Sequence, residues 1–416
     1  MLIKKLVYVS IVFIAIIMSV NCNDSKIQWK DNPSQLLSSE EIKNEINIKM
    51  KRVKDFLEEE GLAGILLTQV RNFYWITAGA ATNQIVLNND IGAASLLIMK
   101  DGKKYVVCSG SEAGRLMDES LRNLGYELKM FDWFNSNPEK DIRGKIIDEL
   151  AGGGKIGSDT NFSGTISVGE KFAGLRYSLT DTEIKKYRWL GKETTTAVAE
   201  VCRKIKPGMS EFELEYLTAC ELRSRGIFPT VLLTAVDQRI YNYRHALPAG
   251  KKLDKYAMIN VVAEKWGMSM AVTRFVHFGP LPEELSKKIN ACAEVNANFQ
   301  AATIPGVPLA QIFDECKQWY EKAGYKDEWQ KHHQGGAIGY NAREFKIYPG
   351  VSGVVEKNQA FAWNPTITGA KIEDTFITYK DHIEVVTISD DWPMIQVSLN
   401  GKVYLQPDIL IKAIGY

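Results

Sequence analysis

The stretch of residues 257–279, AMINVVAEKWGMSMAVTRFVHFG, contains two apolar runs on either side of a short polar segment. Tyr256–Ala263 and Met268–His277 have the length and the β-branched content of strands. Lys265-Trp266-Gly267 between them is typical of a tight turn. The stretch therefore predicts a long β-hairpin.

Helix signals lie on both sides of this hairpin. Upstream, capping boxes at Thr180/Glu183 and Ser210/Glu213 predict two helices, the first ending before Pro207-Gly208 and the second at Gly226. Downstream, helical stretches run to about Ala302 and from Pro305-Gly306 to about Ala323. The repeated order of helices and strands predicts two similar halves that bury their helices against a curved sheet.

The chain before residue 170 has its own alternation of helices and strands. A capping box at Ser38/Glu41 opens an amphipathic helix that ends near Gly61. Strand-like runs follow at 64–68, 93–99 and 104–108, then a helical stretch at 111–124. We expect an α/β domain over residues 41–170, a second domain over 176–395, and a β-like C-terminal extension over 396–416.

The first 22 residues resemble an export signal. Lys4 and Lys5 precede an apolar run, Leu6–Val20, which is too short to span a bilayer but suits a signal-peptide core. Cys22 follows in the position of a lipoprotein cleavage site. We expect residues 1–22 to be a signal peptide, Cys22 to be lipidated, residues 23–40 to be a tether, and the cell envelope to be the location. A plain signal peptide and an uncleaved anchor are the alternatives.

Composition excludes some classes of function. The 416 residues carry 51 Lys and Arg against 50 Asp and Glu, so there is no net field that would draw nucleic acid. The five cysteines after Cys22 are widely spaced and form no CxxC pair, which disfavours a disulfide framework or a zinc knuckle. We expect them to be buried apolar residues, and the membrane to be a partner only through the N-terminal anchor.

Several stretches resemble one family, and they do so in the family's order. They resemble the creatinase/prolidase/aminopeptidase P family of M24 peptidases, and the segment TQVRNFYWITAG (68–79) resembles the N-domain of that family. The resemblance implies an α/β (α+β) fold, with a creatinase/prolidase-like N-terminal domain followed by a pita-bread domain. It also implies a homodimer. The stretches are LTDTEIKKYRWLGKETTTAV (179–198), IKPGMSEFELEYLTACELRSRGI (205–227), YNYRHALP (241–248), the hairpin 257–279, HHQGGAIGYNAREF (332–345), FAWNPTI (361–367) and KIEDTFI (371–377).

The resemblance fails where metallopeptidase members bind two metal ions. Those members use Asp, Asp, His, Glu and Glu, whereas the matching positions here are Asn260, Ala271, Gly336, Asn364 and Glu373. Two divalent ions about 3.5–4 Å apart need several anionic ligands. One carboxylate is too few, so we expect no bound metal and no other cofactor. His332 and the adjacent His333 are expected to face opposite ways on an extended segment and thus not to rebuild a site.

The metal-free branch of the family, creatinase, suggests other roles. The resemblance assigns His245 as general base and Arg343 as a clamp for a carboxylate, with Glu373 as a second catalytic residue that orients the histidine or holds a cationic group. Four more residues are expected to bind substrate: Asn260, Asn364, Thr273 and His332.

The expected function has three alternatives. Thr273 and Asn364 stand where creatinase has glutamates, so the expected substrate is another small anionic or zwitterionic molecule rather than creatine. The first alternative is a metal-free C–N hydrolase, and the second is a non-catalytic envelope protein that binds a metabolite or short peptide. An Xaa-Pro peptidase is the third, and the site argues against it. Whether the chain is an enzyme stays open at this stage.

Overall fold

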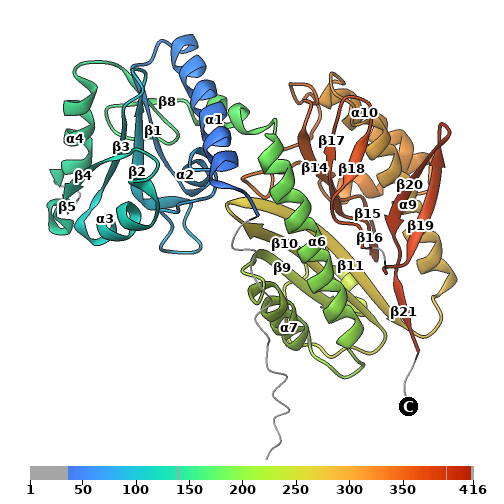
Figure 1. Ribbon diagram of the computed structural model, residues 1–416. Helices are drawn as coiled ribbons and strands as arrows, with labels where there is room; N and C mark the ends of the chain where they lie inside the picture. The colour runs from blue at the N-terminus through green and yellow to red at the C-terminus, as the bar shows by residue number, and fades with distance from the viewer. Residues whose placement is uncertain (1–35, 138–139, 390, 414–416) are drawn as a thin grey trace, which may run out of the picture.

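The computed structural model describes residues 36–137, 140–389 and 391–413 (Figure 1). The predicted signal peptide, Cys22 and most of the predicted tether therefore lie outside the described residues. Among those residues, no helix combines the length and the apolar content needed to cross a bilayer.

The N-terminal part is an α/β layer built on one six-stranded sheet. The strands lie in the order β4-β3-β2-β1-β7-β8. The predicted capping box of the first helix is present, with Ser38 and Glu41 each bonded to the other's backbone N–H. The elements are α1 (Ser39–Glu59), β1 (Gly64–Gln69), α2 (Val70–Ile76), β2 (Ile91–Met99), β3 (Lys104–Ser109), α3 (Gly110–Leu116), β4 (Glu127–Phe131), α4 (Ile142–Ala151), β7 (Ile156–Ser158), β8 (Ile166–Ser167) and α5 (Gly169–Ala173).

The helix predicted over 111–124 is shorter than expected. α3 ends at Leu116 and continues as one turn of π-helix, Met117–Leu121. The short β5 (Ser136–Asn137) and β6 (Lys140–Asp141) form a separate ribbon.

The C-terminal part holds two sheets that share a common core, and both predicted halves are present. The order is β21-β11-β10-β9 in one sheet and β13-β12-β14-β17-β18 in the other. The elements are α6 (Asp181–Lys204), α7 (Glu211–Arg223), β9 (Phe228–Val236), α8 (Gln238–Asn242), β10 (Tyr256–Lys265), β11 (Met268–Phe278), α9 (Glu283–Ala302), α10 (Leu309–Lys322), β12 (Gly335–Ala337), β13 (Phe345–Lys346), β14 (Gln359–Trp363), β15 (Thr366–Ile367), β16 (Ala370–Lys371), β17 (Asp374–Thr378), β18 (Ile383–Val385), β19 (Met394–Leu399), β20 (Lys402–Pro407) and β21 (Leu410–Lys412).

The predicted hairpin is β10–β11, and its register places Asn260 opposite Thr273. The turn is made at Trp266 and Gly267, both with positive φ. Every residue of β11 is buried, because α6 packs on this sheet and β17 of the other sheet meets it. The backbone N–H of Thr273 donates to the carbonyl of Glu373 at 3.0 Å, which joins the two sheets.

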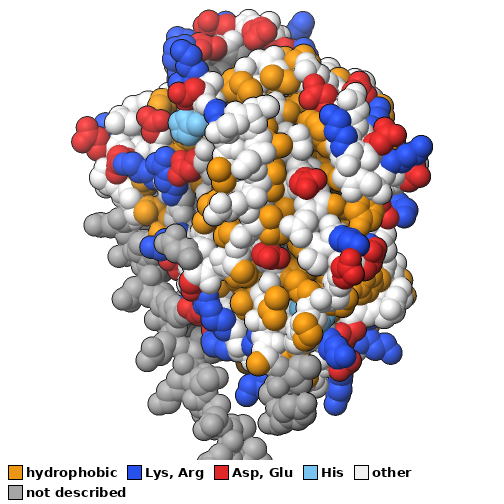
Figure 2. All heavy atoms as spheres, turned by 90° about the vertical axis from the view of Figure 1, so that its right-hand side faces the viewer, with side chains coloured by type: hydrophobic (Ala, Val, Ile, Leu, Met, Phe, Trp, Pro, Cys, Tyr) orange, Lys and Arg blue, Asp and Glu red, His pale blue; other side chains and the backbone are white. Residues whose placement is uncertain are grey.

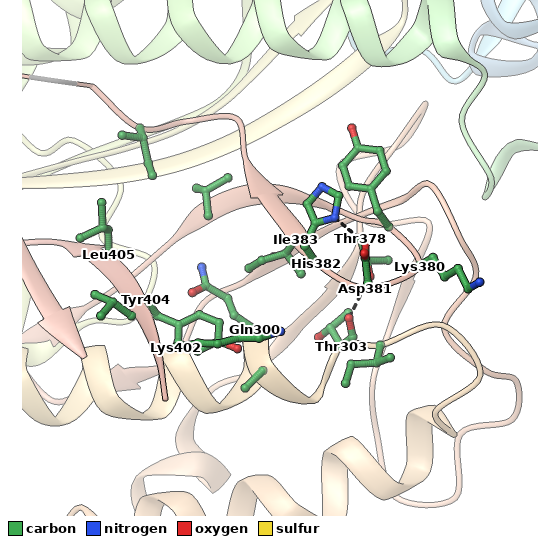
Figure 3. A pocket seen from close by; sticks show the side chains of 16 residues that line it. Gln300, Thr303, Thr378, Lys380, Asp381, His382, Ile383, Lys402, Tyr404 and Leu405 are labelled. Atoms are coloured by element: carbon green, nitrogen blue, oxygen red, sulfur yellow. Dashed lines mark hydrogen bonds and ion pairs between the residues drawn. The ribbon is translucent and has the colours of Figure 1, made fainter. Parts of the chain in front are cut away.

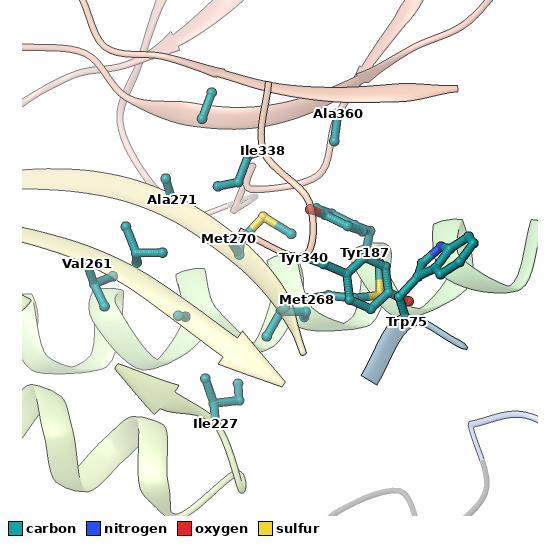
Figure 4. Packing of buried hydrophobic residues seen from close by; sticks show 14 of the residues in the cluster. Trp75, Tyr187, Ile227, Val261, Met268, Met270, Ala271, Ile338, Tyr340 and Ala360 are labelled. Atoms are coloured by element: carbon teal, nitrogen blue, oxygen red, sulfur yellow. The ribbon is translucent and has the colours of Figure 1, made fainter. Parts of the chain in front are cut away.

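The N-terminal and C-terminal parts of the chain are packed through a continuous apolar cluster. Figure 4 shows Trp75 of the N-terminal part beside Tyr187, Met268 and Tyr340 of the C-terminal part. A buried charged group crosses the same interface, since Lys49 of α1 lies 2.8 Å from Glu183 of α6. A buried pair of this kind adds little net stability, because the cost of removing two charges from water offsets much of their attraction.

The predicted C-terminal extension folds onto this domain. β19 and β20 form a hairpin whose turn is at Asn400-Gly401, and it packs on α9. β21 then adds a parallel edge strand to β11. The face that carries these elements shows hydrophobic side chains with charged side chains of both signs around them (Figure 2).

Candidate functional site: a carboxylate neutralised by two internal cations, beside three histidines

Glu373 lies where the two sheets meet, just before β17, and both of its oxygens are occupied. Oε2 accepts from Asn260 Nδ2 at 2.6 Å and Thr273 Oγ1 at 2.8 Å, and it pairs with Lys371 Nζ at 2.8 Å. Oε1 pairs with Arg343 at 2.8 Å. The sequence-predicted residues Asn260, Thr273, Arg343 and Glu373 are therefore brought together, but as partners of one another.

Charge explains why this carboxylate stays ionised in a dry place. Glu373 is 2% exposed, and burial alone would raise its pKa. The ammonium of Lys371 and the guanidinium of Arg343 outweigh burial and hold the pKa of Glu373 well below its usual value. A carboxylate with two cations and two further donors has little capacity to act as a base or to bind a metal ion.

Two of the positions that match the family's other metal ligands, Ala271 and Gly336, offer no ligand atom in this fold. Ala271 is fully buried in the apolar cluster, on the strand that faces Ile338 and Ala360 (Figure 4). A Cβ atom on Gly336 would lie 2.1 Å from the carbonyl oxygen of Phe345. The local backbone therefore excludes a histidine at position 336.

Two polar groups near Glu373 have no partner among the described residues. The side-chain oxygen of Asn364 and Nε of Arg343 are both buried and unbonded. Asn364 is 2% exposed. Buried polar atoms are almost always paired, so these two groups point to a polar ligand. Arg343 is otherwise held by Glu373 and by the carbonyl of Ala342, and it has only part of its fork free for a substrate.

Three histidines form a cluster beside this carboxylate. Nε2 of His245, just after α8, lies 3.0 Å from Nε2 of His332. The ring centroids of His332 and His333 are 4.4 Å apart, and one ring nitrogen from each of the three residues lies within 4.8 Å of the others. The expectation that His332 and His333 face opposite ways was wrong. His332 has an extended backbone, with φ −155° and ψ 147°, but side chains alternate regularly only along a pleated strand, and both residues precede β12, which begins at Gly335.

Neighbouring residues hold the two histidine-bearing segments together. Arg244 pairs with Glu328, which lies four residues before His332, and it also donates to Thr368 Oγ1 at 2.9 Å. The buried Gln334 donates to the carbonyl of His332 at 2.7 Å and accepts from the Tyr320 hydroxyl at 2.8 Å.

All three imidazoles are neutral at physiological pH. Burial, with a contribution from Lys371, lowers the pKa of His332 to about 2. Burial and Arg343 lower the pKa of His333 to about 3. The more exposed His245 has its pKa lowered by burial and then by Lys371. Each neutral ring therefore keeps one unprotonated nitrogen that can accept a hydrogen bond or bind a ligand.

Sequence reasoning missed Lys371 and undervalued His333. Lys371 and Glu373 are two residues apart in an extended segment, so their side chains share one face, and this spacing was a usable signal. The place of His333 depends on the segment that Gln334 holds through the carbonyl of His332, and that contact has no local sequence signature.

A separate cavity of about 370 Å³ lies between α9, β17–β18 and the C-terminal hairpin (Figure 3). Its polar side chains include Gln300, Asp381 and His382, none of which was a predicted site residue. Four of the five described cysteines are buried, as expected, and the fifth is half-buried: Cys108, Cys202, Cys292, Cys316 and Cys220 respectively.

The sequence of this chain is similar to that of known peptidases. Residues 185–380 match the family model described as metallopeptidase family M24. The C-terminal part of this chain is an M24 domain. An uncharacterised peptidase of Staphylococcus aureus is 22% identical over 358 residues, covering 82% of this chain and 98% of that protein.

Solved structures support the pita-bread fold. The Xaa-Pro dipeptidase from Bacillus anthracis has a TM-score of 0.66 at 19% identity, covering 88% of this chain and all of that one. A dipeptidase from Mycobacterium ulcerans has a TM-score of 0.70 at 15% identity, covering 89% of this chain and 98% of that one. The N-terminal domain of a FACT complex subunit from chickpea has a TM-score of 0.60 at 14% identity, covering 82% of this chain and 96% of that one. Proteins with different printed roles share this architecture, so the fold alone does not fix the activity.

The donor set of this chain does not fit the two-metal centre that the family implies. Of the five matching positions, only Glu373 keeps an anionic ligand, and Lys371 and Arg343 already neutralise it. An ammonium 2.8 Å from a carboxylate oxygen takes the place that a metal ion would need. We therefore derive no reaction step through a dinuclear centre.

Proposed function

We propose that this M24 protein is a creatinase-like C–N hydrolase that acts on a small anionic or zwitterionic molecule without the family's dinuclear centre. One observation carries the proposal. The remaining ligand, Glu373, is neutralised by Lys371 and Arg343, and a pair of neutral histidines lies beside it.

The charges around the histidines favour an anionic group on the ligand. Lys371, Arg343 and Lys346 each disfavour the protonated form of His333, and only Glu373 favours it. The site therefore has surplus positive charge when its imidazoles are neutral. A carboxylate on the ligand would offset that charge and could bond to the free Nε of Arg343, while the unpaired oxygen of Asn364 would accept from a ligand N–H.

The His245–His332 pair supplies the proton acceptor in this proposal. Because their Nε2 atoms are 3.0 Å apart, one ring can pass a proton to the other. In the reaction, a water molecule gives a proton to the more accessible His245. The oxygen of that water forms a bond to the carbon of the scissile C–N bond. The C–N bond then breaks, and the same proton passes to the leaving nitrogen. An anionic substrate would raise the low pKa of the pair toward a useful range.

A second function, binding without catalysis, is favoured by one specific observation. Glu373 already has four donors, three on Oε2 and one on Oε1, which leave it little freedom to take up another proton. A general acid or base needs such freedom in the free protein. The site could therefore bind the same kind of ligand and leave it unchanged.

A ligand panel followed by a turnover assay separates these functions. We expect small zwitterions with a carboxylate to raise the melting temperature of the full-length chain, and one class of them to release an amine or urea product detected by NMR. His245→Ala should keep the thermal shift and lose turnover. Full activity of that variant would refute the hydrolase. Binding with no turnover by the wild type would favour the binding protein, and Mn²⁺-dependent cleavage of an Xaa-Pro peptide would refute both.

Location and assembly remain part of this proposal. The N-terminal sequence supports an exported, envelope-bound protein with a lipid on Cys22, and the family resemblance supports a homodimer. Labelled palmitate should be incorporated in the wild type and lost in Cys22→Ala, and light scattering should give twice the mass of one chain.

A further inference from the structure

We propose that His245, His332 and His333 together bind one zinc-class divalent ion, at a site separate from the positions of the family's dinuclear centre. This inference rests on the three rings alone and stands whether or not the chain is catalytic. None of the three residues occupies one of the five positions that match the family's metal ligands.

The spacing of the ring nitrogens suits a tetrahedral ion. Zinc–nitrogen bonds of about 2.0–2.1 Å in a tetrahedron place two ligand nitrogens about 3.3 Å apart. The Nε2 atoms of His245 and His332 are 3.0 Å apart, and the third ring offers a nitrogen within 4.8 Å of both. A small movement of His333 would complete three ligands and leave a fourth position open. Three protein ligands and one open position are the arrangement of catalytic zinc sites.

The outer contacts orient the rings for this role. The hydroxyl of Thr366 donates to the carbonyl of Asn364, so its oxygen can only accept from Nδ1 of His332, which lies 3.5 Å away. A proton on Nδ1 leaves the Nε2 lone pair of His332 to accept from Nε2–H of His245 in the ion-free chain, so His245 must change tautomer before both Nε2 atoms can bind one ion. Partners of this kind fix the tautomer of metal-binding histidines. The Arg244–Glu328 pair fixes the distance between the two segments.

His333 is the weakest of the three ligands. Its Nδ1 accepts from the backbone N–H of Gly335 at 3.2 Å, so its neutral ring carries the proton on Nε2. Binding an ion requires the ring to change tautomer or to give up that bond.

The ligand type selects the ion. The cluster offers neutral imidazoles, with no thiolate and no carboxylate among its three ligands. Imidazole favours Zn²⁺, Co²⁺, Ni²⁺ and Cu²⁺, whereas Mg²⁺, Ca²⁺ and Mn²⁺ prefer oxygen. Lys371 and Arg343 disfavour positive charge on these rings and therefore oppose the charge of the ion. We expect the ion to bind together with an anion such as hydroxide, which as the fourth ligand would offset that repulsion.

Ion binding would use the lone pairs that the proposed hydrolysis needs. A loaded chain is therefore expected to be inactive in that reaction, and a chelator should restore activity. The two proposals fail separately, because ion binding is measured directly and needs no substrate.

The test is a titration of the full-length chain with Co²⁺, followed by visible absorption and by displacement with Zn²⁺. We expect one ion per chain with the absorption of four-coordinate Co²⁺, and no retained Mn²⁺. His245→Ala and His332→Ala should abolish binding. His333→Ala should weaken it by at least about tenfold, the lower end of what is lost when only an outer partner of a metal ligand is removed. The matched control is His382→Ala, which removes an exposed histidine in the distant cavity and should bind as the wild type does.

Two further measurements keep the proposal testable if an alanine variant fails to fold. Zinc-edge X-ray absorption of the wild type should show nitrogen ligands at about 2.0–2.1 Å. Arg244→Met, which keeps all three ligands, should weaken binding by loosening the segments. The proposal is overturned by the absence of saturable binding, by binding that persists without His245 and His332, or by two retained Mn²⁺ ions per chain.

Discussion

The two partners in the Lys371–Glu373 pair should differ sharply in what their removal costs. Glu373→Gln leaves Lys371 and Arg343 buried together with no anion between them, at 8% and 12% side-chain exposure. Removing one partner from a buried ion pair costs about 3–5 kcal/mol, because the remaining charge is uncompensated. We expect a loss of stability within that range. Two unpaired charges raise the cost, but Arg343 is partly exposed and can turn toward solvent, which lowers it.

Lys371→Met should cost much less. Arg343 still neutralises Oε1 of Glu373, and Asn260 and Thr273 still donate to Oε2. Burial also lowers the pKa of Lys371, which shows that its charge is itself costly to bury. We expect a loss below about 1.5 kcal/mol, the usual limit for volume-conserving changes, because no charge is left unpaired.

Urea unfolding of both variants and of the double variant measures this asymmetry. The double variant keeps one buried cation, Arg343, and should fall between the two single variants. The control is Lys287→Met, which breaks the exposed pair with Glu283 and should change stability by less than about 0.5 kcal/mol. Equal losses for Glu373→Gln and Lys371→Met, or a larger loss for the lysine, would refute the view that two internal cations share one carboxylate.

Three further predictions concern the same site. Because burial lowers the pKa of His332 from 6.5 to about 2, the unfolded chain binds more protons between those values, and stability should fall as the pH drops below 6.5, by at most about 1.4 kcal/mol per pH unit for this residue. A His332→Gln variant should show a flatter pH dependence in urea unfolding, and an unchanged slope would contradict the burial of that ring. Gly336→Ala should lose about 1–3 kcal/mol by overpacking against the Phe345 carbonyl, whereas Gly114→Ala, in open space on α3, should lose nothing; equal melting temperatures would contradict this. Asn364→Asp should strengthen binding of a cationic ligand analogue and weaken binding of an anionic one in calorimetry, and no change in either would remove Asn364 from the ligand site.

Local signals predicted most of the fold. The three capping boxes lie at the starts of α1, α6 and α7, and the turn at Trp266-Gly267 joins β10 to β11. Such signals act over three or four residues, so they are visible without tertiary contacts. The π-turn after α3 was missed, because it depends on how Met117 and Leu121 are buried against the sheet.

The candidate site was predictable in its members but not in its contacts. Matching positions identified Asn260, Thr273, Arg343 and Glu373, which do converge. Their convergence depends on the joining of two sheets at the Thr273–Glu373 backbone bond, more than 90 residues apart in the chain. The histidine cluster failed as a prediction because the strand rule was applied to two residues that precede the regular strand β12.

The substitutions at the old metal positions make sense as one change in charge. A centre with two divalent ions needs several carboxylates, and removing the ions alone would leave those carboxylates repelling each other. This chain has lost three of the four carboxylates and balances the last with Lys371 and Arg343, which leaves one surplus positive charge. The apolar cluster around Ala271 cannot offset this surplus positive charge, whereas a carboxylate on a ligand can. The charge balance therefore favours a site that binds an anion over a site without function. A site without function would bind carboxylate ligands equally weakly in the wild type and in a Lys371→Met/Arg343→Met double variant.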